Sequence, residues 1–111
     1  MPNSAQFLAG FDLVPGHVFD GYTLKTATAN EQTVSRYHEY SYDIVLTFDK
    51  SSPAASQANL ALALNVLTRE TRSIKAIRNY YNCSIEAPKN SDFSPDGKGG
   101  FIVKLKGHAT R

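Results

Sequence analysis

The chain has 111 residues, of which 41% are hydrophobic and 20% are charged, and its formal net charge is +2 at pH 7. This is the composition of one globular domain, and no apolar run is long enough to span a membrane. The small positive charge permits a nucleic-acid partner without requiring one. The single cysteine, Cys83, excludes an internal disulfide, and a small buried hydrophobe is its expected role.

The first predicted element is a short helix that begins at Asn3 or Ser4 and ends near Pro15-Gly16. An Asn or Ser side chain accepts a hydrogen bond from the free backbone N–H groups of a first helical turn, and proline interrupts a helix interior. The run from Phe7 to Phe11 is apolar, and its Ala9-Gly10 pair offers a surface for close packing. We therefore expect a helix that packs against another element.

Residues 19–40 show no clear period and are assigned to an extra strand or an excursion. A hairpin is predicted after them. Large apolar side chains alternate with polar ones over residues 41–49, the period of a strand with one buried face. Residues 59–67 have the alanine and leucine content of a helix, yet their large side chains also alternate. We assign them to a second strand, antiparallel to the first across a turn rich in serine at residues 50–57.

A second helix is predicted over residues 68–82. Apolar side chains recur there at a spacing near 3.6 residues, at Ile74, Ile77 and Tyr81. Asn82 is a typical C-terminal stop. Basic side chains occupy the opposite side of this expected helix: Arg69, Arg72, Lys75 and Arg78.

Two further strands complete the predicted fold. The first covers residues 83–87, and the second covers residues 101–106, where apolar and polar side chains alternate again. A loop with a turn at Ser94-Pro95-Asp96-Gly97 joins them, and residues 108–111 form a polar tail. The sequence thus predicts a single α+β domain of order helix, hairpin, helix, hairpin, built on a four-stranded, mostly antiparallel sheet.

This order and two motifs resemble one half-domain of the LAGLIDADG family of homing endonucleases and intron maturases. Leu8-Ala9-Gly10-Phe11 matches the beginning of the family's helix pattern, and Gly16-His17-Val18 matches its end at the right spacing. The run from Leu64 to Ile85 is similar to the family's strand end, short turn, helix and following strand. The family packs two such halves through the motif helices. The resemblance therefore implies that Leu8, Ala9, Gly10 and Phe11 form an interface with a second half-domain or another protein.

The resemblance also implies where a catalytic metal would bind, and the chain departs from the family there. Family enzymes use an acid beside the final glycine of the motif to bind the divalent metal that activates water. Pro15 occupies that position and Leu13 the earlier acidic one, so no metal, no cofactor and no catalysis are expected. Asp12 and Asp20 are the acids that a relocated magnesium site would use. Asp12 is one residue early on a helix, and an acid beside a glycine, as at Asp20, is typical of a turn.

Two groups of basic residues are candidate nucleic-acid contacts. One is the stripe on the predicted second helix, for which a solvated helix back is an equal alternative. The other is Lys104 and Lys106, on the open face of the last strand. The same face is expected to carry Asp43 and Asp49, and acids are the wrong residue type for attracting phosphates or reading base edges.

Together these features predict a catalytically inactive protein of LAGLIDADG descent. Its expected role is that of a structural or RNA-associated subunit of a larger organellar assembly, such as a mitochondrial ribosome. The resemblance alone implies the organelle, a mitochondrion rather than a chloroplast, and no membrane partner is expected. Two alternatives remain open: a homodimeric DNA endonuclease that binds magnesium through Asp12 or Asp20, and a maturase-like RNA-binding splicing factor.

Overall fold

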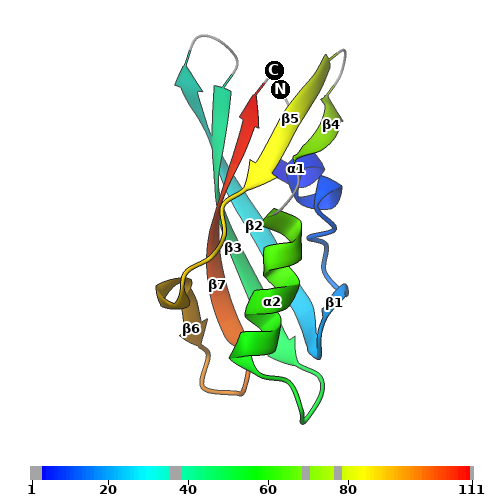
Figure 1. Cartoon of the computed structure of the whole chain (residues 1–111), viewed down its shortest axis with the longest axis vertical. Coiled ribbons are helices and arrows are strands. Elements are labelled where there is room, and N and C mark those ends of the chain that lie inside the picture. The colour runs from blue at the N-terminus through cyan, green and yellow to red at the C-terminus, as the bar shows by residue number, and fades with distance from the viewer. Residues whose placement is uncertain (1–3, 36–38, 69–70, 77–78, 111) are drawn as a thin grey trace.

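Two helices lie on one side of a curled antiparallel sheet in the computed structural model, which describes residues 4–35, 39–68, 71–76 and 79–110 (Figure 1). The elements in chain order are α1 (Ser4–Gly10), β1 (Val18–Phe19), β2 (Tyr22–Ser35), β3 (Glu39–Lys50), α2 (Gln57–Thr68), β4 (Arg72–Ala76), β5 (Asn79–Ile85), the 3₁₀ turn η1 (Asn90–Asp92), β6 (Phe93–Pro95) and β7 (Phe101–Thr110). The strand order is β1-β2-β3-β7-β5-β4, with β6 beside β7. The prediction of an α+β fold is confirmed. The prediction of four strands is wrong, because seven strands pair within the described residues.

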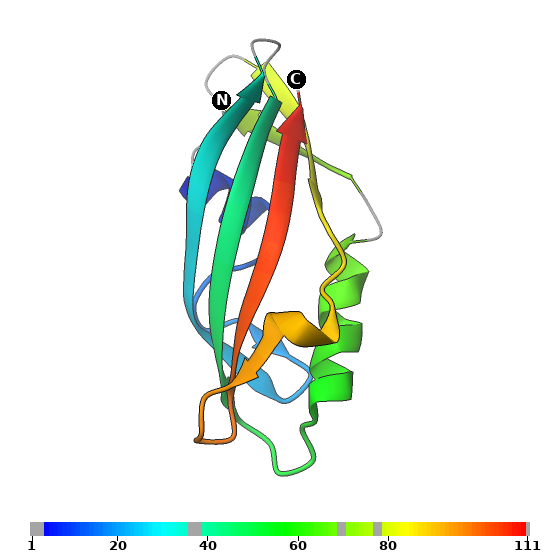
Figure 2. The same cartoon turned by 90° about the vertical axis from the view of Figure 1, so that its left-hand side faces the viewer.

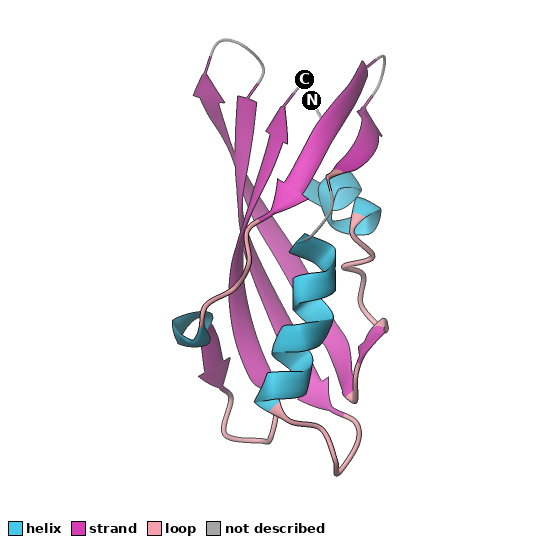
Figure 3. Ribbon diagram, in the orientation of Figure 1, coloured by secondary structure: helices cyan, strands magenta, loops and turns pink. Residues whose placement is uncertain are grey.

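Three long strands, β2, β3 and β7, form the centre of the half-barrel (Figure 2). Both helices lie against the concave side of the sheet (Figure 3). Alternate side chains of β3 and β7 point to that side and build the core with the helices. Those that are buried include Tyr42, Ile44, Leu46 and Phe48 on β3, and Val103, Leu105 and Ala109 on β7. The alternation predicted for residues 41–49 and 101–106 is therefore confirmed. The polar tail predicted for residues 108–111 is wrong, because β7 continues to Thr110 between β3 and β5.

The first helix is shorter than predicted. The N–H of Leu13 donates to the carbonyl of Leu8 at 2.8 Å, and the N–H of Asp12 donates to the carbonyl of Ala9 at 3.0 Å. These two bonds form a Schellman cap, which closes a helix through one left-handed residue, here Asp12 with φ 58°. α1 therefore ends at Gly10, and the predicted continuation to the proline is wrong because the cap turns the chain away earlier.

The uncertain region, residues 19–40, contains an extra strand rather than an excursion. Phe19 of β1 pairs with Tyr22 of β2 across Asp20 and Gly21, both of which have positive φ, 45° and 87°. Such a two-residue loop is typical of a type I′ hairpin turn, for which Asp-Gly is a strong sequence signal. β2 then pairs with β3 along nearly its whole length.

The second predicted strand, residues 59–67, is wrong, because these residues lie in α2. Leu60, Leu64 and Leu67 are buried at helical spacing, whereas Leu62 and Val66 are exposed. The large side chains at the even positions from 60 to 66 therefore lie on two opposite faces of one helix. The high helix propensity of alanine and leucine agrees with this outcome.

The second predicted helix, residues 68–82, is also wrong, because the chain forms the β4–β5 hairpin there. Position 72 pairs with 83 and position 76 pairs with 79. β5 is tied to β7 from Asn82 to Ile85, so long-range pairing prevails over the local helical spacing. The predicted basic stripe depended on that spacing, which a strand does not have. Arg69 and Arg78 lie outside the described residues, and Arg72 and Lys75 lie on β4.

α1 is attached to the sheet through Phe7. Its ring stacks on Tyr42 of β3 with a centroid distance of 4.2 Å and an interplanar angle of 17°. It also meets Phe11 at 5.1 Å. A Cβ atom at Gly107 of β7 would lie 2.4 Å from Cζ of Phe7, so the ring occupies space that only a glycine leaves open.

Candidate functional site

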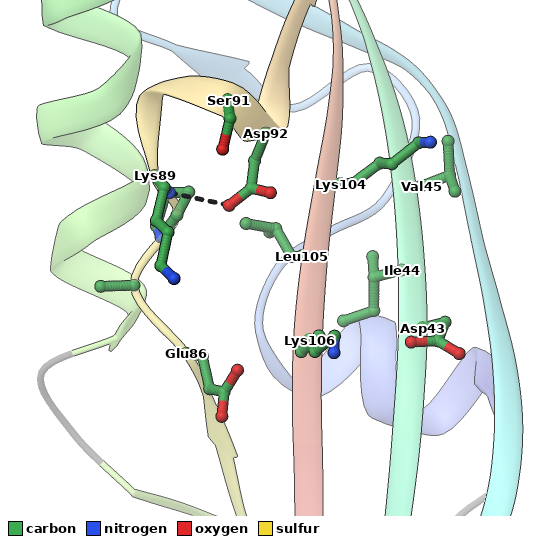
Figure 4. A pocket seen from close by; sticks show the side chains of 12 residues that line it. Asp43, Ile44, Val45, Glu86, Lys89, Ser91, Asp92, Lys104, Leu105 and Lys106 are labelled. Carbon is green, nitrogen blue, oxygen red and sulfur yellow. Dashed lines mark hydrogen bonds between the residues drawn. The ribbon is translucent and has the colours of Figure 1, made fainter.

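A cleft of about 570 Å³ lies where the chain leaves the sheet between β5 and β6 (Figure 4). β5 pairs with β7 as far as Ile85 and Gly107, and β6 pairs with β7 from Phe93 and Val103. Residues 86–92 therefore loop away from the middle of β7. They form one wall of the cleft, and the outer face of β3 and β7 forms the other.

Three lysines line this cleft, and we call it the lysine cleft. Lys104 and Lys106 come from β7, and Lys89 comes from the loop that faces them. All three residues are exposed. Among the described residues, none of the three ammonium groups forms an ion pair or a hydrogen bond. The cleft therefore presents three cations without direct ion-pair partners in the described ranges.

Two of the three carboxylates that line the lysine cleft form hydrogen bonds within the protein. Oδ2 of Asp92 accepts a hydrogen bond from the backbone N–H of Lys89 at 2.7 Å, which closes η1 at its start. Oε1 of Glu86 lies 3.1 Å from Nε2 of His108. Asp43 stands opposite Lys106 in the register of β3 and β7 and forms no ion pair within the described part of the chain. These hydrogen bonds orient Asp92 and Glu86 without cancelling their charge, so the cleft is lined by three cationic and three anionic side chains.

The lysine cleft also has apolar residues in its lining, and they differ in exposure. Ile44 and Leu105 point into the core and are 1% and 5% exposed, whereas Val45 and Pro88 are half-buried. The accessible apolar surface of the cleft therefore comes from Val45, Ala87 and Pro88, and charged side chains of both signs surround it.

The predicted interface helix contributes mostly to the core of this chain. Leu8 and Phe11 are buried, with 7% and 0% of their surfaces exposed. Ala9 is exposed and Gly10 is half-buried. Of the four residues expected to contact a partner, only these two face outward.

The two acids considered for a relocated magnesium site lie in turns. Asp12 caps α1 and Asp20 occupies the β1–β2 turn, and both are exposed. Pro15, at the position of the family acid, lies beyond the end of α1. No group of three His, Cys, Asp or Glu side chains that could hold a metal ion is found in the described ranges.

Cys83 is fully buried on β5 and forms no disulfide. Burial raises the pKa of its thiol to about 11. Because a thiolate is the reactive form, we expect slow alkylation of the native protein and fast alkylation after unfolding in urea. Comparable labelling rates for the native and unfolded chains would contradict the burial.

The raised thiol pKa also predicts a pH dependence of stability. The unfolded chain releases the thiol proton at a lower pH than the native chain does, since the pKa rises from 9.0 to about 11 on folding. The free energy of unfolding should therefore fall as the pH rises through this window. Burial also raises the pKa of Tyr42, which acts in the same direction. Urea unfolding across the window should show a shallower fall for Cys83→Ala than for the natural chain, and identical slopes would contradict the assignment.

Sequence reasoning found Lys104 and Lys106 but missed Lys89. The first two stand out because they alternate with apolar residues on a strand. Lys89 lies in a loop after Pro88, and no local pattern distinguishes it from any other surface lysine. Only the path of residues 86–92 brings it to the cleft.

Neither described helix has the length and apolarity needed to cross a membrane. Comparison with known proteins gave no match to any family model, to any curated protein or to any solved structure.

Proposed function

We propose that this protein is a non-catalytic, RNA-associated subunit of a larger assembly and that RNA phosphates bind at the lysine cleft. One observation carries this proposal: Lys89, Lys104 and Lys106 line one cleft, and none of them forms an ion pair among the described residues. Ammonium groups without a direct ion-pair partner attract a polyanion and displace the counterions that surround its phosphates. Binding of this kind requires no catalytic group.

The surface next to the cleft supports contact with RNA backbone rather than readout of duplex DNA. The register places Thr28, Val45 and Lys104 in one row across the sheet, and Asn30, Asp43 and Lys106 in the next. The hydroxyl of Thr28 and the amide of Asn30 suit ribose and phosphate contacts, whereas the carboxylate of Asp43 counts against a phosphate beside it. Arginine pairs for guanine edges are absent from these two rows.

LAGLIDADG descent is part of the same proposal. The location of the Leu8-Ala9-Gly10-Phe11 motif in the first helix supports it. The run from Leu64 to Ile85 counts against it, because α2 and the β4–β5 hairpin lie where the family pattern has a strand end, a turn, a helix and a strand. The early end of α1 counts against it, because the family pattern continues to Val18. Membership of a mitochondrial ribosome, or of another organellar assembly, is proposed from the resemblance alone.

A protein neighbour is also part of the proposal, and the outer side of α2 offers the larger surface for it. Leu62 and Val66 are 62% and 59% exposed and lie one helical turn apart. Exposed apolar groups in a row are typical of contact surfaces. α1 adds Ala9 and Gly10 to what a partner can contact.

Fluorescence anisotropy with a labelled single-stranded RNA tests the proposed function. We expect salt-sensitive binding, with log affinity falling against log salt at a slope of about −2, since three lysines would each release about 0.7 counterions. Absence of RNA binding at low salt would overturn RNA association. Magnesium-dependent cleavage of duplex DNA that Asp12→Asn or Asp20→Asn abolishes would overturn the non-catalytic role.

A further inference from the structure

We propose that two copies of this chain pair antiparallel along the outer edge of β2, across a twofold axis normal to the sheet, so that their sheets join into one. This pairing does not depend on RNA binding. β2 lies at one margin of the sheet, with β3 on its inner side (Figure 2). Among the described residues, its outer side pairs with the two residues of β1, and Leu24 bonds the backbone of Gly16 and His17. An edge strand with free N–H and C=O groups is a template for another strand.

The alternation of the sheet shows which backbone groups of β2 face this edge. The carbonyl of Lys106 accepts a bond from the N–H of Glu86, so the backbone groups of Lys106 point towards β5. Those of Asp43, opposite Lys106 on β3, therefore point towards β2, and those of Asn30, opposite Asp43, point back to β3. Positions 27, 29, 31 and 33 consequently direct their groups outward. Beyond Leu24, no backbone hydrogen bond within the described ranges reaches them.

The free part of β2 lacks the features that usually protect an edge strand, which are proline, lysine or a covering element. Residues 26–32 contain neither proline nor lysine, and Lys25 stands at a bulge before them. Both helices lie on the concave side of the sheet. Glu31 is the one charged residue of this stretch, and its Oε2 accepts a hydrogen bond from the Tyr42 hydroxyl at 3.0 Å. That bond holds the carboxylate against its own chain.

Two limits select the register of the pair. Opposed residues in an antiparallel ladder share a face, so one residue of β2 must face its own copy across the axis. With Ala29 at the axis, position 34 would oppose Leu24 of the second copy, whose outer backbone groups are already bonded. With Glu31 at the axis, two carboxylates would oppose each other, which destabilises a strand pair. Asn30 at the axis avoids both conflicts.

A second copy fits this edge better than a foreign peptide does. Positions 27, 29, 31 and 33 of each copy would exchange about eight backbone bonds, close to the roughly ten direct hydrogen bonds of a typical protein interface. The two Asn30 amides can bond each other, since an amide carries both donors and an acceptor. A foreign peptide would leave its own outer edge unpaired, whereas two copies cover the free edges of both chains.

A cysteine at the axis tests the register. Asn30→Cys would place two thiols in a non-hydrogen-bonded pair, whose Cα atoms lie about 4.5 Å apart, within reach of a disulfide. Gln32→Cys is the matched control, because Gln32 is exposed on the same face of β2 but would oppose Thr28 of the second copy. We expect about tenfold more disulfide-linked dimer from Asn30→Cys under mild oxidation. Cys83 is buried and serves as a common background. Equal cross-linking of the two variants would overturn the register.

Sedimentation equilibrium tests the pairing without a cysteine. The natural chain should reach twice its mass of 12.2 kDa as its concentration rises. Asn30→Lys would oppose two ammonium groups and should raise the dissociation constant about tenfold, whereas Gln32→Lys adds the same charge away from the axis and should raise it much less. Both residues are exposed, so neither change disturbs the core. A chain that stays monomeric at millimolar concentration would overturn the proposal, as would filaments in which β2 pairs with the opposite edge strand β4.

Discussion

Replacement of both Lys104 and Lys106 by glutamine is expected to weaken RNA binding about 30-fold at a fixed salt concentration. Each ammonium group would lose a charge-assisted contact worth about 1 kcal/mol, and 1.4 kcal/mol corresponds to a tenfold change in affinity. Both side chains are exposed, so the free energy of unfolding should change by no more than about 0.5 kcal/mol. Fluorescence anisotropy and thermal unfolding measure the two quantities.

The matched control for this change is the replacement of Lys50 and Lys98 by glutamine. These exposed lysines lie together beside Ser52 and Pro53, away from the lysine cleft, and their loss alters the net charge by the same amount. RNA affinity should fall several-fold less than in the cleft variant. Equal losses in the two double variants would show that net charge, and not the cleft, governs binding.

Gly107→Ala is expected to destabilise the protein by about 2 kcal/mol. The new methyl group would lie 2.4 Å from Cζ of Phe7 and 2.6 Å from its Cε1, so the ring must move off Tyr42 and α1 must shift with it. Overpacking of this kind costs about 1–3 kcal/mol. A melting temperature lowered by about 8 °C would report the effect in a domain of this size.

A double variant separates this contact from a general effect on β7. Phe7→Leu removes the ring and is itself destabilising, but it also makes room for the methyl group of Gly107→Ala. The two changes together should therefore cost less than the sum of the single changes. Strict additivity would contradict the packing of Phe7 over Gly107.

The centre of the sheet could be predicted from the sequence because the two faces of its strands have different surroundings. On β3 and β7, one face packs against the helices and the other meets solvent, so apolar and polar residues alternate. The Asp20-Gly21 turn also carried a local signal, since few other residue pairs tolerate positive φ at both positions.

The errors at α2 and at the β4–β5 hairpin have different physical causes. The outer side of α2 carries Leu62 and Val66, so the helix lacks the polar face that would reveal a 3.6-residue period. The hairpin is fixed by pairing of β5 with β7, and residues 68–82 contain no local signal for that partner.

The lysine cleft could be predicted only in part, because long-range strand pairing places one of its lysines. Lys104 and Lys106 share a strand, and their common face follows from the period of two. Lys89 reaches them because β5 and β6 pair with different parts of β7 and leave residues 86–92 to bridge the interval. A site formed in this way can be recognised only when the pairing of β5 and β6 with β7 is known.

Mapping the RNA contact on the free protein by NMR is the most direct test of binding at the lysine cleft. A short single-stranded RNA titrated into the labelled protein should shift the backbone amide signals of residues 86–92 and 104–106 first, and added salt should reverse these shifts. Shifts confined to α2 or to the outer edge at β1 would contradict binding at the lysine cleft, as would a spectrum that RNA leaves unchanged.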